Sequence, residues 1–181
     1  RVAKEALAAQ PAGAHPKAIV DGVVAGLRKE YPDHIIEGEP EWLFNNAGGA
    51  MGAMIVLHAS LSEYVIIFGS PIGTEGHSGR FLSDDYFTIL HGEQWAYEPG
   101  QLVKEVYKPG SQHHMKLGVA KGYKIPDSGC WALEYARGNI LSMMPFGMAD
   151  LFSSTLDPVT FWKTVKVSGF NMLLNLLKGK V

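Results

Sequence analysis

Short apolar runs of strand length, separated by turn residues, dominate residues 53–138. The runs occupy 53–59, 64–68, 86–90, 101–107, 115–124 and 130–136. Glycine or proline stands between most of them, at 76–79, 92, 99–100, 109–110 and 126–129. Strands of this length and spacing are typical of an all-β barrel or sandwich, and closure into a barrel would hide the strand edges. We therefore predict a mainly β fold whose β-barrel covers residues 42–138.

Helical patterns flank the predicted barrel on both sides. Residues 1–31 carry apolar side chains at three- and four-residue intervals around a break at 11–16, and Pro32 ends this stretch. Residues 140–156 and 158–178 also have helical length, with Asp157 as the N-cap and Pro158 in the first turn of the second helix. A chain of 181 residues has the size of one domain. We predict a single domain with an N-terminal helical segment (1–36), the barrel (42–138) and C-terminal amphipathic helices (139–181).

The second C-terminal stretch has a wide apolar face edged by lysines. Two interpretations fit this pattern: helices that pack on the barrel or form an oligomer contact, or a pair of helices that lie in the plane of a membrane. No uninterrupted apolar run in the sequence reaches the roughly 18 residues that a membrane-spanning helix needs. Because the chain begins with Arg1 rather than Met, we expect the native N-terminus to lie upstream.

Composition excludes several classes of function. The 16 Lys and Arg residues nearly balance the 18 Asp and Glu residues, so no basic field is available to hold a nucleic acid. The single cysteine, Cys130, excludes an internal disulfide framework. Hydrophobic residues make up 46% of the chain and charged residues only 19%, which leaves a surplus of apolar side chains to be buried or covered.

Motifs for metals, cofactors and nucleophiles are missing or weak. His113 and His114 are adjacent, so on a strand they would point to opposite faces and could not bind one metal together. The segment 76–79 (GHSG) places Ser beside His, but adjacency in sequence is not the geometry of a catalytic triad. The segment 46–52 lacks the spacing of a dinucleotide or phosphate loop and suits a tight turn or a close backbone approach. We expect neither a cofactor nor a metal.

Carboxylates within apolar strands are the more informative group. Alternation along residues 131–136 places Glu134 on the same face as Ala132 and Ala136, where small neighbours leave room beside the acid. If that face is buried, the Glu134 pKa rises and its carboxyl can donate a proton near neutral pH. If it faces outward, Glu134 is an ordinary solvated residue, and the sequence pattern alone leaves both alternatives open.

A second acidic pair precedes the strand at 86–90. Alternation directs Asp85 to the same side as Phe87 and Ile89, so one residue of the pair Asp84–Asp85 is expected to point inward. The same reasoning gives Tyr64, Ile66 and Phe68 a shared face, which would line either a plain core or a cavity.

Several blocks resemble the family of fungal-type sterol C-8 isomerases and sigma non-opioid receptors. They are 46–49 (NAGG), 51–54 (MGAM), 58–64 (HASLSEY), 76–80 (GHSGR) and 134–138 (EYARG), in the order in which the family has them. The resemblance covers residues from about 42 to 157. Of the two branches, the segments 84–90 (DDYFTIL) and 131–138 (WALEYARG) are more similar to the isomerase.

The resemblance implies a cupin-like β-barrel around an occluded apolar cavity, with two C-terminal helices against the endoplasmic reticulum membrane. It also implies a native N-terminal membrane anchor and a homotrimer. In the receptor branch an Asp pairs with the Glu that matches Glu134, and that Glu binds the ammonium group of a ligand. Phe87 occupies the position of that Asp here, so we expect Asp85, or failing that Asp84, to be the partner of Glu134. The substrate-binding positions that the resemblance implies are Met54, Val56, Tyr64, Phe68, Phe81, Phe87, Ile140 and Met144.

These expectations lead to three functional hypotheses. The first is a sterol Δ8–Δ7 isomerase of ergosterol-type biosynthesis, which uses Glu134 with Asp85 or Asp84 and is inhibited by hydrophobic cationic amines. The second is a receptor-like protein at the endoplasmic reticulum membrane that binds such amines or sterols without turnover, since fold does not fix function. The third is a metal-dependent cupin enzyme, which stoichiometric metal in the purified protein would support.

Overall fold

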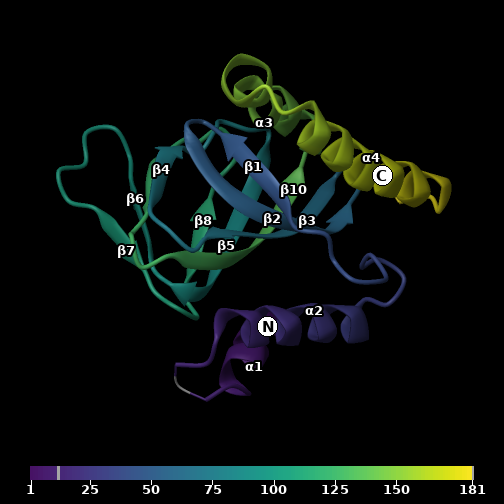
Figure 1. The fold of residues 1–181 in the computed structure, drawn as a ribbon, viewed down its shortest axis with the longest axis horizontal. Coiled ribbons are helices and arrows are strands. Elements are labelled where there is room, and N and C mark those ends of the chain that lie inside the picture. The colour runs from purple at the N-terminus through teal and green to yellow at the C-terminus, as the bar shows by residue number, and fades with distance from the viewer. Residues whose placement is uncertain (12, 181) are drawn as a thin grey trace.

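The predicted strands form two antiparallel sheets in the computed structural model, which describes residues 1–11 and 13–180 (Figure 1). The larger sheet comprises, in spatial order, β1 (Leu43–Ala47), β2 (Ala50–Ala59), β3 (Glu63–Ser70), β10 (Cys130–Gly138), β5 (Ser83–Gly92) and β8 (Gln112–Met115). The smaller sheet comprises β4 (Thr74–His77), β9 (Gly122–Ile125), β6 (Gln94–Tyr97) and β7 (Glu105–Tyr107). Ile125 of the smaller sheet packs among Met54 and Phe68 of the larger one, so the sheets face each other across a core. The expected mainly β fold is confirmed.

Two of the predicted strands are wrong in extent. Only the last three residues of 101–107 pair, as β7, because the start of that run is a turn in which the backbone N–H of Gln101 donates to the carbonyl of Glu98. The run 115–124 is divided between β8 and β9. Gly118 divides it, since its φ of 78° lies in the left-handed region and forms a turn that an extended strand cannot contain.

Two glycines within the segment 46–52 form the tight turn between β1 and β2. Ala47 pairs with Ala50 across the hairpin, and Gly48 and Gly49 between them both have positive φ. A Cβ atom on Gly48 would lie 2.3 Å from the carbonyl oxygen of His77 on β4. Glycine is therefore required at this position both by its φ and by the close approach of another strand, as the sequence predicts.

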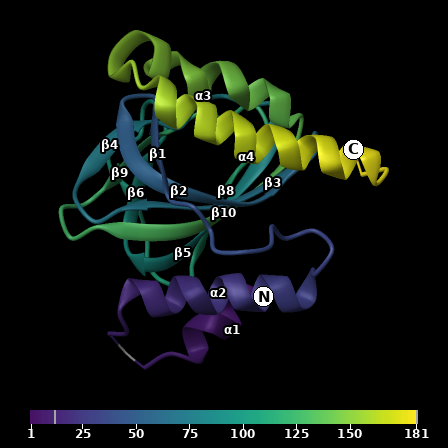
Figure 2. The ribbon, with the colours of Figure 1, turned by 45° about the vertical axis from the view of Figure 1, so that its right-hand side comes forward.

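Two N-terminal helices cover the outer face of the larger sheet. They are α1 (Val2–Ala8) and α2 (Pro16–Glu30), which agrees with the predicted helical segment and its break, although residue 12 within that break lies outside the described residues. Val23 and Leu27 of α2 pack on Ile55, Ile67 and Leu90 of the sheet. In Figure 2 these helices lie beneath the sheet, on the side away from the C-terminal helices.

The C-terminal helices lie on the opposite side of the molecule from α1 and α2, across one end of the strands (Figure 2). The predicted stretch 140–156 contains a 3₁₀ turn, η1 (Ile140–Met143), α3 (Met144–Asp150) and a π-helical turn, η2 (Leu151–Thr155), and the second stretch contains α4 (Pro158–Leu177). Asp157 caps α4 as predicted, because its Oδ1 accepts from the N–H groups of Val159 and Thr160 at 3.1 and 3.0 Å. Residue 181 lies outside the described residues.

Polar contacts hold α4 over the strands. The side-chain amide of Asn175 donates to the carbonyl of Ala59 at 2.8 Å, and the hydroxyls of Tyr64 and Ser168 are 3.2 Å apart. The helices thus close one end of the space between the two sheets.

Within the described residues, no helix combines the length and hydropathy that crossing a membrane requires.

Candidate functional site

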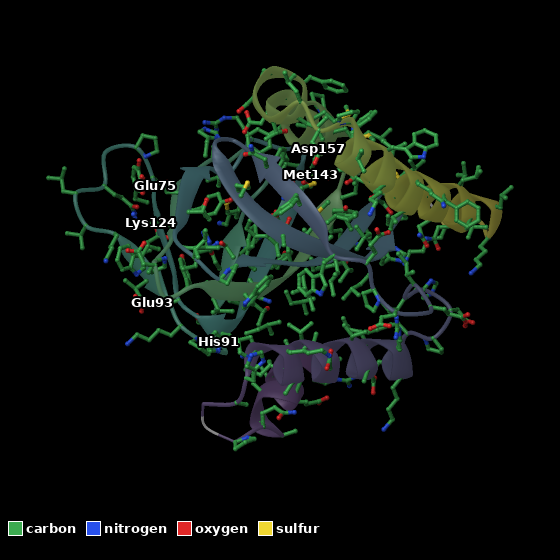
Figure 3. All side chains as sticks on the ribbon, viewed as in Figure 1. Glu75, His91, Glu93, Lys124, Met143 and Asp157 are labelled. Atoms are coloured by element: carbon green, nitrogen blue, oxygen red, sulfur yellow. The ribbon has the colours of Figure 1, made fainter. Side chains whose placement is uncertain are left out.

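An apolar cavity of about 410 Å³ lies between the two sheets and the C-terminal helices. Its walls are formed by the inner faces of β1, β2, β3, β5, β8 and β10, with β6 and β9 opposite and α3 and α4 at one end. Met143 and Asp157, labelled in Figure 3, line the end where the helices meet the strands. His91 and Glu93 lie toward the opposite end of the strands, away from those helices (Figure 3). The apolar surplus of the composition is partly accounted for by this lining.

Glu134 lies on the wall of the cavity, near the middle of β10. Its register partners are Ile66 on β3 and Phe87 on β5, and both of these side chains also line the cavity. Glu134 is only 8% exposed, while its strand neighbours Leu133 and Tyr135 face the other way. The inward alternative for Glu134 is therefore the one that the fold realises.

Asp85 is the acidic neighbour of Glu134. It lies on β5 opposite Ala136 of β10, two residues along the strand from Phe87, so the two carboxyls share one face. Asp85 is 2% exposed and is joined to Glu134 by a side-chain hydrogen bond. Its Oδ1 makes no hydrogen bond to any other described residue. A hydrogen bond between two carboxyls requires a proton on one of them, so the pair is built to hold at least one proton.

Burial raises the pKa of both acids. It raises the pKa of Glu134 from its ordinary value of 4.5 to about 7, against the opposing effect of the hydrogen bond with Asp85. Burial, followed by the charge and hydrogen bond of Glu134, raises the pKa of Asp85 well above 3.8. The two groups titrate as a pair. Near neutral pH the pair combines one carboxylic acid with one carboxylate inside an apolar space.

Asp84 lies outside the cavity. Its carboxylate is 41% exposed and accepts from His114 Nε2 at 2.9 Å, on the face of β5 opposite Asp85. The hydrogen bond from His114 lowers the pKa of Asp84. Asp84, the second choice of partner for Glu134, therefore does not approach it, because alternation turns adjacent strand residues to opposite faces.

Seven of the predicted substrate-binding residues line the cavity: Met54, Tyr64, Phe68, Phe81, Phe87, Ile140 and Met144. Val56 is buried in the inner core beside Ile66, but it is not one of the lining residues. Tyr64 is close enough to Glu134 for the carboxylate charge to contribute, after burial, to raising its pKa to about 12. Aromatic rings thus surround the carboxyl pair on the strands that flank it.

Sequence reasoning missed several polar lining residues, among them Gln94 on β6, His113 on β8 and Tyr123 on β9. Alternation had already predicted that His113 and His114 point to opposite faces, so it could have indicated that one of them points inward. No comparable signal marked Gln94, since its strand is short and its position depends on pairing with distant segments. Within the described residues, no group of three or more His, Cys, Asp or Glu side chains is placed to hold a metal ion.

Comparison with solved structures finds resemblances of low sequence identity. The DMSP lyase DddQ from Ruegeria pomeroyi has a TM-score of 0.49 and 19% identity, over 77% of this chain and 74% of that one. An RmlC-like cupin from Shewanella frigidimarina has a TM-score of 0.48 and 18% identity, over 59% of this chain and 91% of that one.

Comparison with characterised sequences finds much closer relatives. The C-8 sterol isomerase ERG2 of Gibberella zeae is 53% identical over 99% of this chain and 75% of its own length, and the C-8 sterol isomerase of Pyricularia oryzae is 56% identical over 93% and 76%. The sigma non-opioid intracellular receptor 1 of Gallus gallus is 38% identical over 93% of this chain and 76% of its own length. The family described as ERG2 and Sigma1 receptor like protein matches residues 1–180. The chain therefore belongs to the family of ERG2 and Sigma1 receptor like proteins.

Proposed function

We propose that this chain is a sterol C-8 isomerase, which moves a ring double bond from the Δ8 to the Δ7 position in ergosterol-type sterol biosynthesis. The observation that carries the proposal is the buried pair of Glu134 and Asp85 on the wall of an apolar cavity. The identity of 53–56% to proteins named C-8 sterol isomerase supports it. The lower identity to sigma receptors, 38% for the chicken protein, places the chain nearer the isomerase branch.

The proposed reaction needs one acid and one base, and the pair supplies both. A neutral carboxyl donates its proton to C9 of the sterol, which leaves a cation at C8. The neighbouring carboxylate stabilises that cation and accepts the proton lost from C7, so the protein ends with as many protons as it began with. Because an alkene is a weak base, the acid must stay protonated at neutral pH, as burial arranges for Glu134 and Asp85.

Aromatic side chains beside the pair suit a cationic intermediate. Phe87 is the register partner of Glu134, and Tyr64 and Phe68 lie on the adjacent strand β3. A ring face near a desolvated cation contributes about 0.5–2 kcal/mol. The apolar lining also keeps water from capturing the cation, which favours proton loss over hydration.

Turnover of a Δ8 sterol in detergent tests the proposal. The wild-type protein is expected to form the Δ7 isomer and to incorporate solvent deuterium at C9. Glu134→Gln and Asp85→Asn should each lower kcat by at least about a hundredfold, since each removes an acid or base at the reacting carbons. Asp84→Asn is the matched control for Asp85→Asn, because its carboxylate faces His114 outside the cavity, and it should retain activity within about threefold. Full activity in Glu134→Gln would refute the assignment.

The same pair favours a second candidate function, the binding of hydrophobic amines without turnover. An ammonium group can replace the shared proton and pair with the carboxylates of Glu134 and Asp85. Cationic amines would also inhibit the isomerase by imitating its cation, so amine binding does not separate the two functions. Tight amine binding by a protein that leaves a Δ8 sterol unchanged would favour the receptor-like function.

We also propose that the C-terminal helices lie against the lipid of the endoplasmic reticulum membrane, the location that the resemblance implies. The exposed face of α4 supports contact with a membrane. Five of its large apolar side chains are more than half exposed: Val159, Trp162, Phe170, Leu173 and Leu177. A face of this kind suits a helix in the plane of a bilayer. Brominated lipids should quench Trp162 fluorescence, and Trp162→Phe should remove that quenched signal; an unquenched Trp162 would contradict the proposal. The homotrimer remains a prediction from the resemblance, to be measured by the mass of the detergent-solubilised protein.

A further inference from the structure

Two buried side chains at the cavity wall have polar atoms without a hydrogen-bonding partner in the described residues. Gln94 on β6 is 4% exposed and His113 on β8 is 3% exposed, and both line the cavity. Gln94 Oε1 and both ring nitrogens of His113 make no hydrogen bond to any residue in the described ranges 1–11 and 13–180. Leaving such groups unpaired in a folded interior costs free energy, so their presence at a cavity wall points to a ligand that pairs with them.

Tyr107 is a common neighbour of Gln94 and His113. Gln94 is the register partner of Tyr107 on β7, and the Tyr107 ring stacks on the His113 ring with their centroids 4.3 Å apart. We call Gln94 and His113 the polar pole of the cavity. The pole belongs to two strands from different sheets, which the Tyr107 ring joins.

A partly buried ion pair behind Tyr107 holds the Tyr107 ring in place. The Tyr107 hydroxyl donates to Glu105 Oε2 at 2.7 Å, and Lys121 Nζ donates to both oxygens of Glu105 at 2.8 and 2.7 Å. Burial, followed by the positive charge of Lys121, lowers the pKa of His113 to about 4. The imidazole is therefore neutral at physiological pH, with one nitrogen that donates and one that accepts.

Phe87 lies between His113 of the pole and Glu134 of the carboxyl pair. His113 is the register partner of Phe87, and Phe87 is the register partner of Glu134. Two strand spacings separate the backbones of His113 and Glu134 by about 10 Å. A fused pair of sterol rings, with a contact of about 3 Å at each end, fills such a span. The hydroxyl of a sterol lies on the ring next to the one that carries the migrating double bond.

We propose that Gln94 and His113 bind the ring hydroxyl of the sterol and thereby set the reacting carbons against Glu134 and Asp85. The inference rests on the proposed function and adds the residues that position and select the substrate. A hydroxyl donates one hydrogen bond and accepts others, so it can donate to Gln94 Oε1 and accept from the protonated nitrogen of His113. A ketone only accepts and leaves Gln94 Oε1 unpaired, and a sterol without oxygen leaves both groups unpaired.

Sterol binding by the full chain in Glu134→Gln, which prevents turnover, tests the inference. The three probes are a Δ8 sterol, its 3-ketone and its 3-deoxy analogue, at one detergent concentration. The hydroxysterol should bind at least about tenfold more tightly than the deoxy analogue, with the ketone between them. This series needs no variant at the pole, so it does not depend on whether such a variant folds.

Gln94→Met and His113→Phe, combined in the same background, should reduce the preference for the hydroxyl to within about twofold. Both substitutions keep the size of the side chain, and since they remove unpaired polar atoms they should leave the melting temperature unchanged or higher. Gln112→Met is the matched control, because Gln112 lies next to His113 but is exposed and bonds Thr88 on the outer face. It should retain the full preference, and comparison with it cancels differences in how the sterols partition into detergent.

Three results would overturn the inference. Equal binding of hydroxysterol and deoxy analogue, with normal turnover of the Δ8 sterol by wild-type protein, removes the pole as a binding site and leaves the proposed function standing. Retention of the hydroxyl preference in the folded Gln94→Met, His113→Phe protein has the same meaning. Loss of the hydroxyl preference in Asn46→Leu would also overturn the inference, because it would assign the hydroxyl to Asn46, whose Oδ1 on β1 is another unpaired lining atom. If wild-type protein neither turns over the Δ8 sterol nor binds it, the proposed function fails as well.

Discussion

Replacing Glu134 by glutamine should abolish activity and stabilise the protein at neutral and alkaline pH. The pKa of Glu134 rises from 4.5 to about 7 in the fold, with burial as its largest cause. Between these pH values the folded protein keeps a proton that the unfolded chain has lost, so the free energy of unfolding falls as pH rises. The loss is about 1.4 kcal/mol for each pH unit, or about 3 kcal/mol in total by pH 7–8. Glutamine has the same shape and does not ionise, so the variant avoids this loss.

Urea unfolding at several pH values between 4 and 8.5 measures the effect. Relative to wild type, Glu134→Gln should gain about 3 kcal/mol on going from pH 4 to pH 8, which corresponds to a rise in melting temperature of about 6–12 °C for a chain of this size. Asp85 is present in both proteins, although its pKa falls somewhat when the charge of Glu134 is removed. The difference between the two curves therefore reports mainly on Glu134.

Glu63→Gln is the matched control because the pKa of Glu63 is displaced in the opposite direction. Burial acts to raise that pKa, but hydrogen bonds from Lys180 and Tyr135 outweigh burial and lower it. Its contribution to stability is present above pH 4.5 and is lost as pH falls. Glu63→Gln should therefore lower the free energy of unfolding above pH 4.5 by an amount that stays constant from pH 5 to 8, and this difference from wild type should shrink only at more acid pH. Identical pH dependence in Glu134→Gln and wild type would refute the claim that Glu134 is buried as a neutral acid.

Three further measurements test other parts of the structure. The rate of sterol isomerisation should fall about tenfold per pH unit below about pH 7. At such pH both Glu134 and Asp85 are protonated, so no carboxylate is left to act as the base. A rate that does not change from pH 5 to 7 would contradict the paired titration. Asp157→Ala should lower the free energy of unfolding by about 1 kcal/mol, measured by urea, because two N–H groups of α4 lose their cap. Lys121→Met should cost about 1–3 kcal/mol in the same assay, since Glu105 loses both hydrogen bonds from the lysine but keeps the one from Tyr107. A loss below about 1 kcal/mol would show that solvent replaces the lysine.

The sequence predicted those features that depend on local periodicity. Alternation along one strand placed Glu134 with Ala132 and Ala136, and the structure has this arrangement because β10 is a regular strand buried on its inner face. The helical segments at both ends were equally local, since Asp157 with Pro158 marks the start of α4 within a few residues. Such signals need no knowledge of which strand pairs with which.

Features that depend on distant pairing were missed or remained ambiguous. Leu102 and Val103 precede β7 in the same apolar run, yet they are 99% and 80% exposed because no strand among the described residues pairs with them. Gln94 carries no local mark of function, and it reaches the cavity only because β6 pairs with β7 and β9. The polar pole joins residues from both sheets, so it exists only after the sheets have packed together.

Asp84 and Asp85 show how register decides the role of a side chain. They are chemically identical neighbours, but alternation along β5 turns their side chains to opposite faces of the sheet. Asp85 faces Glu134 in an apolar interior that raises its pKa, while Asp84 faces His114 at the surface, where the hydrogen bond lowers its pKa. A shift of β5 by one residue would exchange the two, so the β5–β10 pairing is itself a requirement of the acid–base chemistry. Five register pairs run from Phe87–Glu134 to Ser83–Gly138. They include Ala136 opposite Asp85, and together they keep the Asp85 carboxyl facing inward.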